Sequence, residues 1–145
     1  MRNTKICTNK TSKRRIQMIK DNKNLKTEAQ IELIFEELTK KHSISNCNLN
    51  FNYNSRNTRR MGYCKPYTRG KTKKYDIVIC MNNPIVEKWE KDSEFKRLML
   101  HELAHALTEQ KYGYQKKCHN SVWLAVYNSM RRKENLKDIK YPRYK

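Results

Sequence analysis

Residues 101–105 read His-Glu-Leu-Ala-His, a run that combines the side chains used in metal-dependent hydrolysis. On an α-helix, side chains four residues apart share one face and lie about 6 Å apart along the axis. That spacing lets His101 and His105 hold one ion through their ring nitrogens, and zinc is the metal that such pairs bind. Glu102 is poorly placed as a third ligand but can take up and return a proton. The run therefore predicts one zinc ion per chain, with Glu102 as the general base.

The surrounding residues predict that this run lies on a largely buried helix. Neither Gly nor Pro occurs from Phe95 to Leu107, where apolar residues recur at spacings of three and four. Asp92 or Ser93 is a candidate N-cap, and Gly113 is a candidate stop. The alternative is that the same five residues lie on a surface helix, with both histidines in water and no metal. Burying two unpaired histidines costs free energy, so the apolar context favours the metal site.

A catalytic zinc site has three protein ligands and one open position, so a third ligand must come from elsewhere. The candidates are His42, Glu109, Cys118, His119 and Glu134. Glu109 continues the spacing of the histidines but lies roughly 12 Å along the axis from His101. His119 begins a later helix that can fold back across the metal helix. We predict His119 as the third ligand, with Cys118 as the alternative.

Three strands and two further helices are predicted around the metal helix. Thr27 and Gln30 form a capping box, which begins an amphipathic helix that runs to about His42. Alternating or β-branched residues predict strands at 49–53, 61–67 and 75–80. Apolar spacing predicts a last helix after Asn120, with Trp123 and Tyr127 on its buried face. The expected fold class is α+β, with a three-stranded antiparallel sheet packed on the metal helix.

The charge of the chain points to a polyanionic partner. Its 145 residues suit a single domain and carry 33 Lys and Arg against 14 Asp and Glu, a net charge of +19. Nucleic acid is the simplest partner for such a chain, although a basic surface kept for solubility is the alternative. Polar and basic composition predicts a mobile arm over residues 1–26, a folded domain over 27–132 and a basic tail over 133–145.

Residues 54–74 are the strongest candidate for contact with nucleic acid, because they hold eight Lys and Arg and no acid. Tyrosines interleave with these cations, and that combination suits a surface that follows a phosphate backbone and stacks on bases. DNA is therefore an expected partner, with single strands preferred. The predicted contacts are Arg56, Arg59, Arg60, Tyr63, Tyr67, Lys71, Lys73 and Lys74. The alternative is a solvated hairpin whose tyrosines pack on the sheet.

Several classes of protein are excluded by what the sequence lacks. No stretch approaches the roughly 18 apolar residues of a membrane span, and the N-terminus has no apolar core of a secretory signal. The five cysteines are odd in number and include no CxxC pair, which argues against a disulfide framework. We expect a monomer in a reducing intracellular compartment.

Taken in order, four pieces of the chain resemble the SprT-like (Spartan-type) zinc metallopeptidases. They are RRMGYC at 59–64, YDIVICMN at 75–82, LMLHELAHAL at 98–107 and HNSVW at 119–123. The resemblance implies a small zincin-like domain with His101, His105 and His119 as zinc ligands and Glu102 as general base. It also implies a protein substrate crosslinked to DNA, and hence a role in DNA repair.

Two features depart from the family pattern. Asn120 stands where the pattern has Gly, as in the related WLM-type peptidases, and the chain has no cysteine pairs for a C-terminal zinc ribbon. Any binding of DNA must then come from its own basic segments. A second class of protein stays open, namely a nucleic-acid-binding protein with a purely structural zinc site closed by a ligand such as Cys118.

Overall fold

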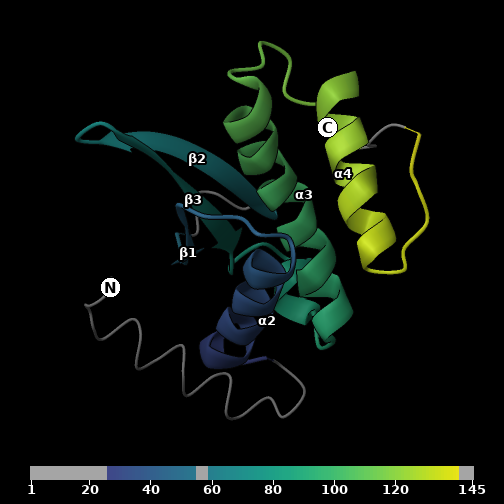
Figure 1. Ribbon diagram of the computed structural model, residues 1–145. Helices are drawn as coiled ribbons and strands as arrows, with labels where there is room; N and C mark the ends of the chain where they lie inside the picture. Colours follow the sequence, from purple (N-terminus) through teal and green to yellow (C-terminus); the bar gives the residue numbers. More distant parts are fainter. Residues whose placement is uncertain (1–25, 55–58, 141–145) are drawn as a thin grey trace.

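The computed structural model of the protein describes residues 26–54 and 59–140. In chain order the elements are α2 (Glu28–Lys41), β1 (Cys47–Asn52), β2 (Gly62–Arg69), β3 (Thr72–Cys80), the short 3-10 helix η1 (Val86–Lys88), α3 (Asp92–Tyr112) and α4 (Ser121–Lys133). Helix α3 lies between the sheet and α4, with α2 beside it (Figure 1). The predicted α+β class, with three strands and three α-helices, is confirmed. Nearly all of the predicted arm over 1–26 lies outside the described residues, as does Arg56.

The sheet is mixed, so the prediction of an antiparallel sheet is wrong for one pair of strands. Its strand order is β1-β3-β2, with β2 antiparallel and β1 parallel to β3. Strand β3 therefore lies in the centre, and the last residues of β1 and the first of β2 flank the same end of it. There the Cys80 N–H donates to the Met61 carbonyl and the Met81 N–H to the Asn52 carbonyl, both at 2.8 Å. Alternating side chains reveal which face is buried but not the direction of a neighbouring strand.

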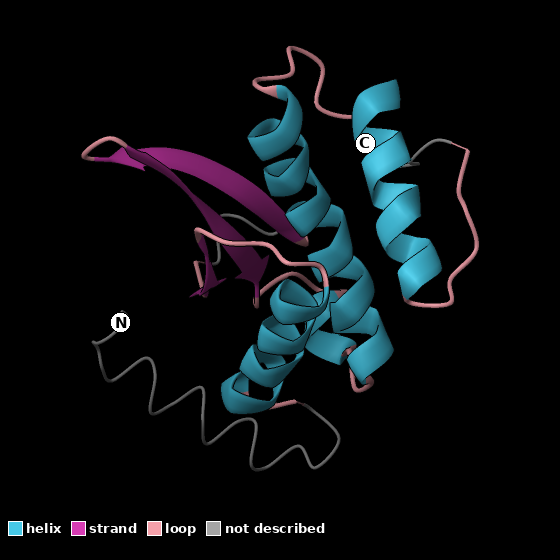
Figure 2. Ribbon diagram, in the orientation of Figure 1, coloured by secondary structure: helices cyan, strands magenta, loops and turns pink. Residues whose placement is uncertain are grey.

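Strands β2 and β3 form a long hairpin that continues past the residues predicted from hydrophobicity. Its turn lies at Gly70, which adopts a positive φ of 65°. The hairpin tip is polar and exposed, and it extends well beyond the helices (Figure 2). Apolar patterning therefore identified only the half of the hairpin that packs on the core.

Helix α2 begins and packs as predicted. The Thr27 N–H donates to Gln30 Oε1 at 2.8 Å, and the Gln30 N–H donates to Thr27 Oγ1 at 3.2 Å, so the capping box is confirmed. Its predicted apolar face is buried: Ile31, Ile34, Phe35 and Leu38. These side chains join one core with β3 and α3. Among the described residues no helix has the length and apolar character needed to cross a bilayer.

The C-terminal end of α2 is tied to the end of α4 by a buried hydrogen bond between His42 and Glu134, since burial lowers the pKa of His42 and favours its neutral ring. Atom Nε2 of His42 lies 2.7 Å from Glu134 Oε2, and the side chains are only 1% and 2% exposed. The ammonium of Lys96 on α3 lies 2.7 Å from the other carboxylate oxygen. The chain then turns back along α4, where the Asn128 side chain pairs with the backbone of Ile139. His42 and Glu134 are thus occupied with each other, away from the predicted metal site.

Gly62 allows β2 to approach both β3 and α3 closely. A Cβ at this position would lie 2.6 Å from the Val78 carbonyl oxygen and 3.3 Å from the Leu98 side chain. We expect Gly62→Val to lower the free energy of unfolding by about 1–3 kcal/mol, because the backbone must shift. Urea unfolding measures this. Gly70→Asn is the control, since the turn has open space and Asn tolerates positive φ, so its effect should stay within about 0.5 kcal/mol. Equal stabilities of the Gly62 variant and the parent would contradict the close packing.

Candidate metal centre

Helix α3 presents two histidines, one turn apart, to a cavity that is also lined by β2 and by the loop before α4. It starts at Asp92, after Lys91, and the Glu94 carboxylate accepts from the Lys91 N–H at 3.1 Å. The prediction that Asp92 or Ser93 is the N-cap is therefore wrong by one or two residues, because Glu94 satisfies the backbone donors instead. The predicted stop at Gly113 is confirmed by its φ of 83°.

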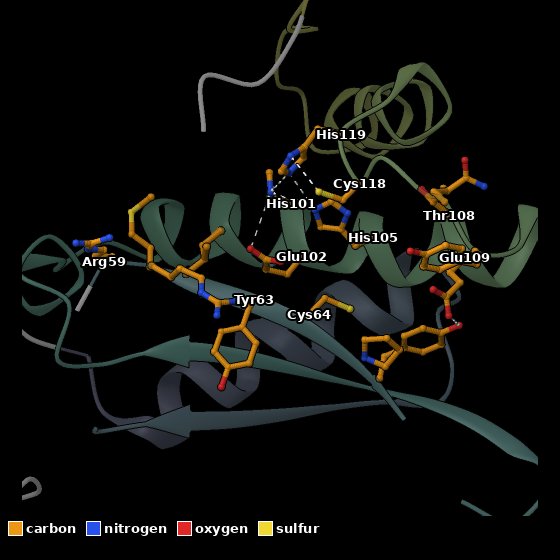
Figure 3. Close-up of a pocket in the computed structure, with 18 residues that line it drawn as sticks. Arg59, Tyr63, Cys64, His101, Glu102, His105, Thr108, Glu109, Cys118 and His119 are labelled. Carbon is orange, nitrogen blue, oxygen red and sulfur yellow. Dashed lines mark hydrogen bonds and ion pairs between the residues drawn. The ribbon is translucent and has the colours of Figure 1, made fainter. Parts of the chain in front are cut away.

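The structure brings His101, His105 and His119 together at one point (Figure 3). Their Nε2 atoms are separated by 3.3 Å (His101 to His105), 3.2 Å (His105 to His119) and 3.0 Å (His101 to His119). Tetrahedral zinc, with Zn–N distances of about 2.0–2.1 Å, places its nitrogen ligands about 3.3 Å apart. The three nitrogens therefore fit a single ion of this size.

The loop before α4 positions His119 next to His101 and His105. The last helix begins after Asn120, as predicted; Asn120 is the N-cap of α4, and its Oδ1 accepts from the Trp123 N–H at 3.0 Å. The other end of the amide donates to Gln115 Oε1 at 2.8 Å, which ties the cap to the preceding loop. An Asn at this position thus holds the loop through both ends of its side chain, which a Gly does not offer.

Burial keeps the three imidazoles neutral. It lowers the pKa of His101 to about 3, with the neighbouring His105 and His119 adding to the shift. Burial, with His119 nearby, lowers the pKa of His105 to about 4, and burial lowers that of His119 as well. The neutral ring is the form that binds metal, so the site is ready for a cation near pH 7.

The aromatic rings of Trp123 and Tyr127, both on α4, pack against the histidines. Trp123 is fully buried and stacks on His105, with ring centroids 5.1 Å apart and planes inclined by 20°. It also lies 4.8 Å from the rings of both His101 and His119, and Tyr127 stacks behind it. The apolar spacing of the sequence predicted Trp123 and Tyr127 only as residues of the buried face of the last helix. The spacing of four from His119 to Trp123 to Tyr127 was the signal for this supporting role.

Glu102 lies beside the histidines, where the sequence predicted the general base. Its carboxylate is 6% exposed, and Oε2 lies 4.0 Å from His101 Nε2. Burial raises the pKa of the Glu102 carboxyl to about 8, and the positive charge of Arg60 opposes that shift. A pKa near the working pH lets one carboxyl group both take up a proton and give it back, as general acid–base catalysis requires.

Cys118, the alternative third ligand, lies on the outer side of His119. Its exposed thiol sulfur is 3.6 Å from His119 Nδ1, the ring nitrogen that does not face the other histidines. The thiol therefore contacts the side of the His119 ring that points away from the other two histidines. Glu109 likewise lies apart from the three nitrogens, one turn beyond His105 on α3.

A cavity of about 670 Å³ opens in front of the three histidines. Strand β2 forms one wall with Gly62, Cys64 and Pro66, and α3 forms another. Arg59, Arg60, Glu109 and Tyr114 also line the cavity, and Figure 3 shows Arg59 and Glu109 on opposite sides of Glu102.

The structure separates the predicted nucleic-acid contacts into groups. Arg59 and Arg60 reach the cavity, and the Arg60 guanidinium lies 4.8 Å above the Tyr63 ring. Figure 3 shows that ring on the far side of β2 from Glu102. On the same hairpin, the Tyr67 hydroxyl accepts a hydrogen bond from the side chain of Asn48 on β1, at 3.1 Å. Of the three predicted lysines, Lys71 lies at the hairpin turn and Lys74 lies half-buried on β3, and neither forms an ion pair with another described residue. Lys73 instead pairs with Glu109 on α3.

Comparison with known proteins gives one match. The model of the SprT-like family matches residues 27–141, which is most of the chain. Neither the curated proteins nor the solved structures include a match.

Proposed function

The chain belongs to the SprT-like family, and from that premise we propose that it is a zinc-dependent endopeptidase with a zincin-like domain. Family membership indicates a metallopeptidase-like role. The observation that carries the proposal is the set of three neutral, mutually facing imidazole nitrogens with a buried carboxylate beside them. Three ligands from the protein leave one position open, which is typical of catalytic zinc sites.

The chain's own residues divide the work of peptide hydrolysis. His101, His105 and His119 would hold zinc, which supplies acidification of water and polarisation of the peptide carbonyl. Glu102 accepts the proton from the attacking water and delivers it to the leaving amine. The Trp123 ring packs against all three imidazoles and fixes their orientation. Because β2 is an edge strand that lines the cavity, an extended substrate can pair with its free backbone groups.

The alternative, a purely structural zinc site, has less support. Structural sites are closed by a fourth ligand. Over residues 26–54 and 59–140, the group that includes these histidines contains no fourth metal-binding side chain. The thiol of Cys118 lies behind His119 instead. X-ray absorption at the zinc edge would distinguish nitrogen and oxygen neighbours from a site that contains sulfur.

We further propose that the substrates are proteins associated with or crosslinked to DNA, which would give the peptidase a role in DNA repair. The support is a basic and aromatic face on the β2–β3 hairpin. Alternate residues of a strand share a face, so the face of β2 away from α3 carries Tyr63, Lys65, Tyr67 and Arg69. Lys74 pairs with Tyr67 on the same face. Tyrosines between cations suit base stacking along a single strand.

Neutralising this face should weaken binding to DNA. The triple variant Lys65→Gln, Arg69→Gln, Lys74→Gln should lower affinity and reduce the slope of log K against log salt by about 0.7–0.9 per lost phosphate contact. Fluorescence anisotropy at several salt concentrations measures both. The charge-matched control replaces Lys40, Lys88 and Lys133 with Gln, away from the hairpin. An equal loss in both variants would show that overall charge, and not the hairpin face, attracts the polyanion.

A further inference from the structure

Glu109 places a carboxylate in the substrate cavity, one helical turn beyond His105. The hydroxyl of Tyr75 donates to Glu109 Oε2 at 3.0 Å, and the ammonium of Lys73 lies 2.6 Å from the same oxygen. The Glu109 side chain is 15% exposed, and Tyr75 is buried. Both Glu109 and Tyr75 line the cavity. The proposed reaction makes no use of this carboxylate.

The two partners of Glu109 differ in how firmly they hold it. Burial raises the pKa of the Tyr75 hydroxyl, and its hydrogen bond to Glu109 adds to the shift, so this group remains a protonated donor. Lys73, in contrast, is a flexible side chain that is 49% exposed. A surface ion pair of this kind contributes little net free energy, because ordering the side chain and screening by water offset the attraction. Tyr75 therefore fixes the carboxylate, whereas another cation can replace Lys73.

We propose that Glu109, oriented by Tyr75, is a specificity-determining residue that binds a lysine or arginine side chain of the substrate. The substrate cation takes the place of the Lys73 ammonium. This inference rests on the proposed peptidase function and specifies which substrates that site prefers. Lys73 itself demonstrates that the position accepts an ammonium group next to the cavity.

The position of Glu109 limits where the basic residue must stand. Four residues of helix separate His105 from Glu109, about 6 Å along the axis. An extended peptide advances about 3.3 Å per residue. The basic residue should therefore lie one or two positions from the bond that is cleaved. Figure 3 shows Arg59 on the opposite side of Glu102 from Glu109. Arg59 would repel a cation there, so the preference should fall on one side of that bond.

Peptides that differ in one residue test the subsite. A fluorogenic series carries lysine or the isosteric, uncharged norleucine at each of three positions on both sides of the scissile bond. We expect lysine to be preferred at one position. There Glu109→Gln should lower kcat/KM for the lysine peptide by about tenfold or more, since a charge-assisted hydrogen bond is lost, with little change for norleucine. Lys73→Met should raise kcat/KM for the lysine peptide.

Binding without turnover provides a second readout. The measurement uses the Glu102→Gln variant, which binds peptides without cleaving them. Calorimetry should show that adding Glu109→Gln lowers the affinity for the lysine peptide by about tenfold and leaves the affinity for the norleucine peptide unchanged. Glu87→Gln, an exposed acid on η1, is the matched control and should change neither peptide.

Two kinds of failure are distinguishable. An active parent without a positional preference for lysine overturns the subsite alone. An equal loss for lysine and norleucine peptides, together with a lower melting temperature, would show that the Glu109 cluster only stabilises the fold. A parent that cleaves none of the peptides contradicts the proposed function and the subsite with it.

Discussion

Replacing Glu102 with glutamine is expected to lower the rate of peptide hydrolysis by about 10²–10⁴-fold, the usual contribution of a general base. The amide keeps the shape of the side chain but cannot take a proton from water. The three histidines are untouched, so zinc content should match that of the parent. Initial rates on a denatured or flexible protein substrate measure the first effect, and elemental analysis measures the second.

The stability of this variant separates a catalytic role from a structural one. Burial raises the pKa of Glu102, which means that the folded protein disfavours its charged form. A neutral glutamine avoids that cost, so the melting temperature should be equal to or above that of the parent. Glu87→Gln on the exposed surface of η1 should leave the rate within about twofold. If Glu102→Gln kept most of the activity, another residue would have to serve as the base.

The helices were predictable because local patterns determine them. In α2, the Thr27 capping box and the apolar spacing of Ile31 to Leu38 specify the start, the type and the buried face without reference to the rest of the chain. The same holds for His101 and His105, whose relation on α3 follows from helix geometry. His119 depended on a further assumption, that the last helix folds back, which the packing of Trp123 under all three rings explains.

The remaining features depend on tertiary contacts that local patterns do not encode. The parallel pairing of β1 with β3 joins residues far apart in the chain, such as Cys47 and Tyr75. Long charged side chains were the hardest to assign. Lys73 and Arg60 were both predicted as contacts to nucleic acid, but Lys73 pairs with Glu109 and Arg60 reaches the cavity beside Glu102. The sequence shows that Lys73 and Arg60 are charged. Which groups they contact depends on strands and helices that come together only in the folded protein.

Removing one imidazole should separate metal binding from folding. Binding of structural zinc by four ligands is worth about 10–16 kcal/mol, or about 3–4 kcal/mol for each ligand. We therefore expect His119→Ala to weaken zinc binding by about 10²–10³-fold. His119 lies in the loop before α4 and is partly exposed, so the fold should survive the change. Competition with a chromophoric chelator gives the affinity, and far-ultraviolet circular dichroism verifies the helices.

Cys118→Ser is the matched test of the alternative ligand, because the thiol is the immediate neighbour of His119 in sequence. The sulfur contacts Nδ1, on the back of the ring, so its loss affects only the orientation of His119. Substitutions of such supporting partners weaken metal binding by about 10–100-fold, and this exposed contact belongs at the low end. The ratio of the two effects decides the assignment. If Cys118→Ser lost more zinc affinity than His119→Ala, the third ligand would be the Cys118 sulfur and not His119. Large and similar losses in both variants would instead indicate four ligands, and hence a closed, structural zinc site.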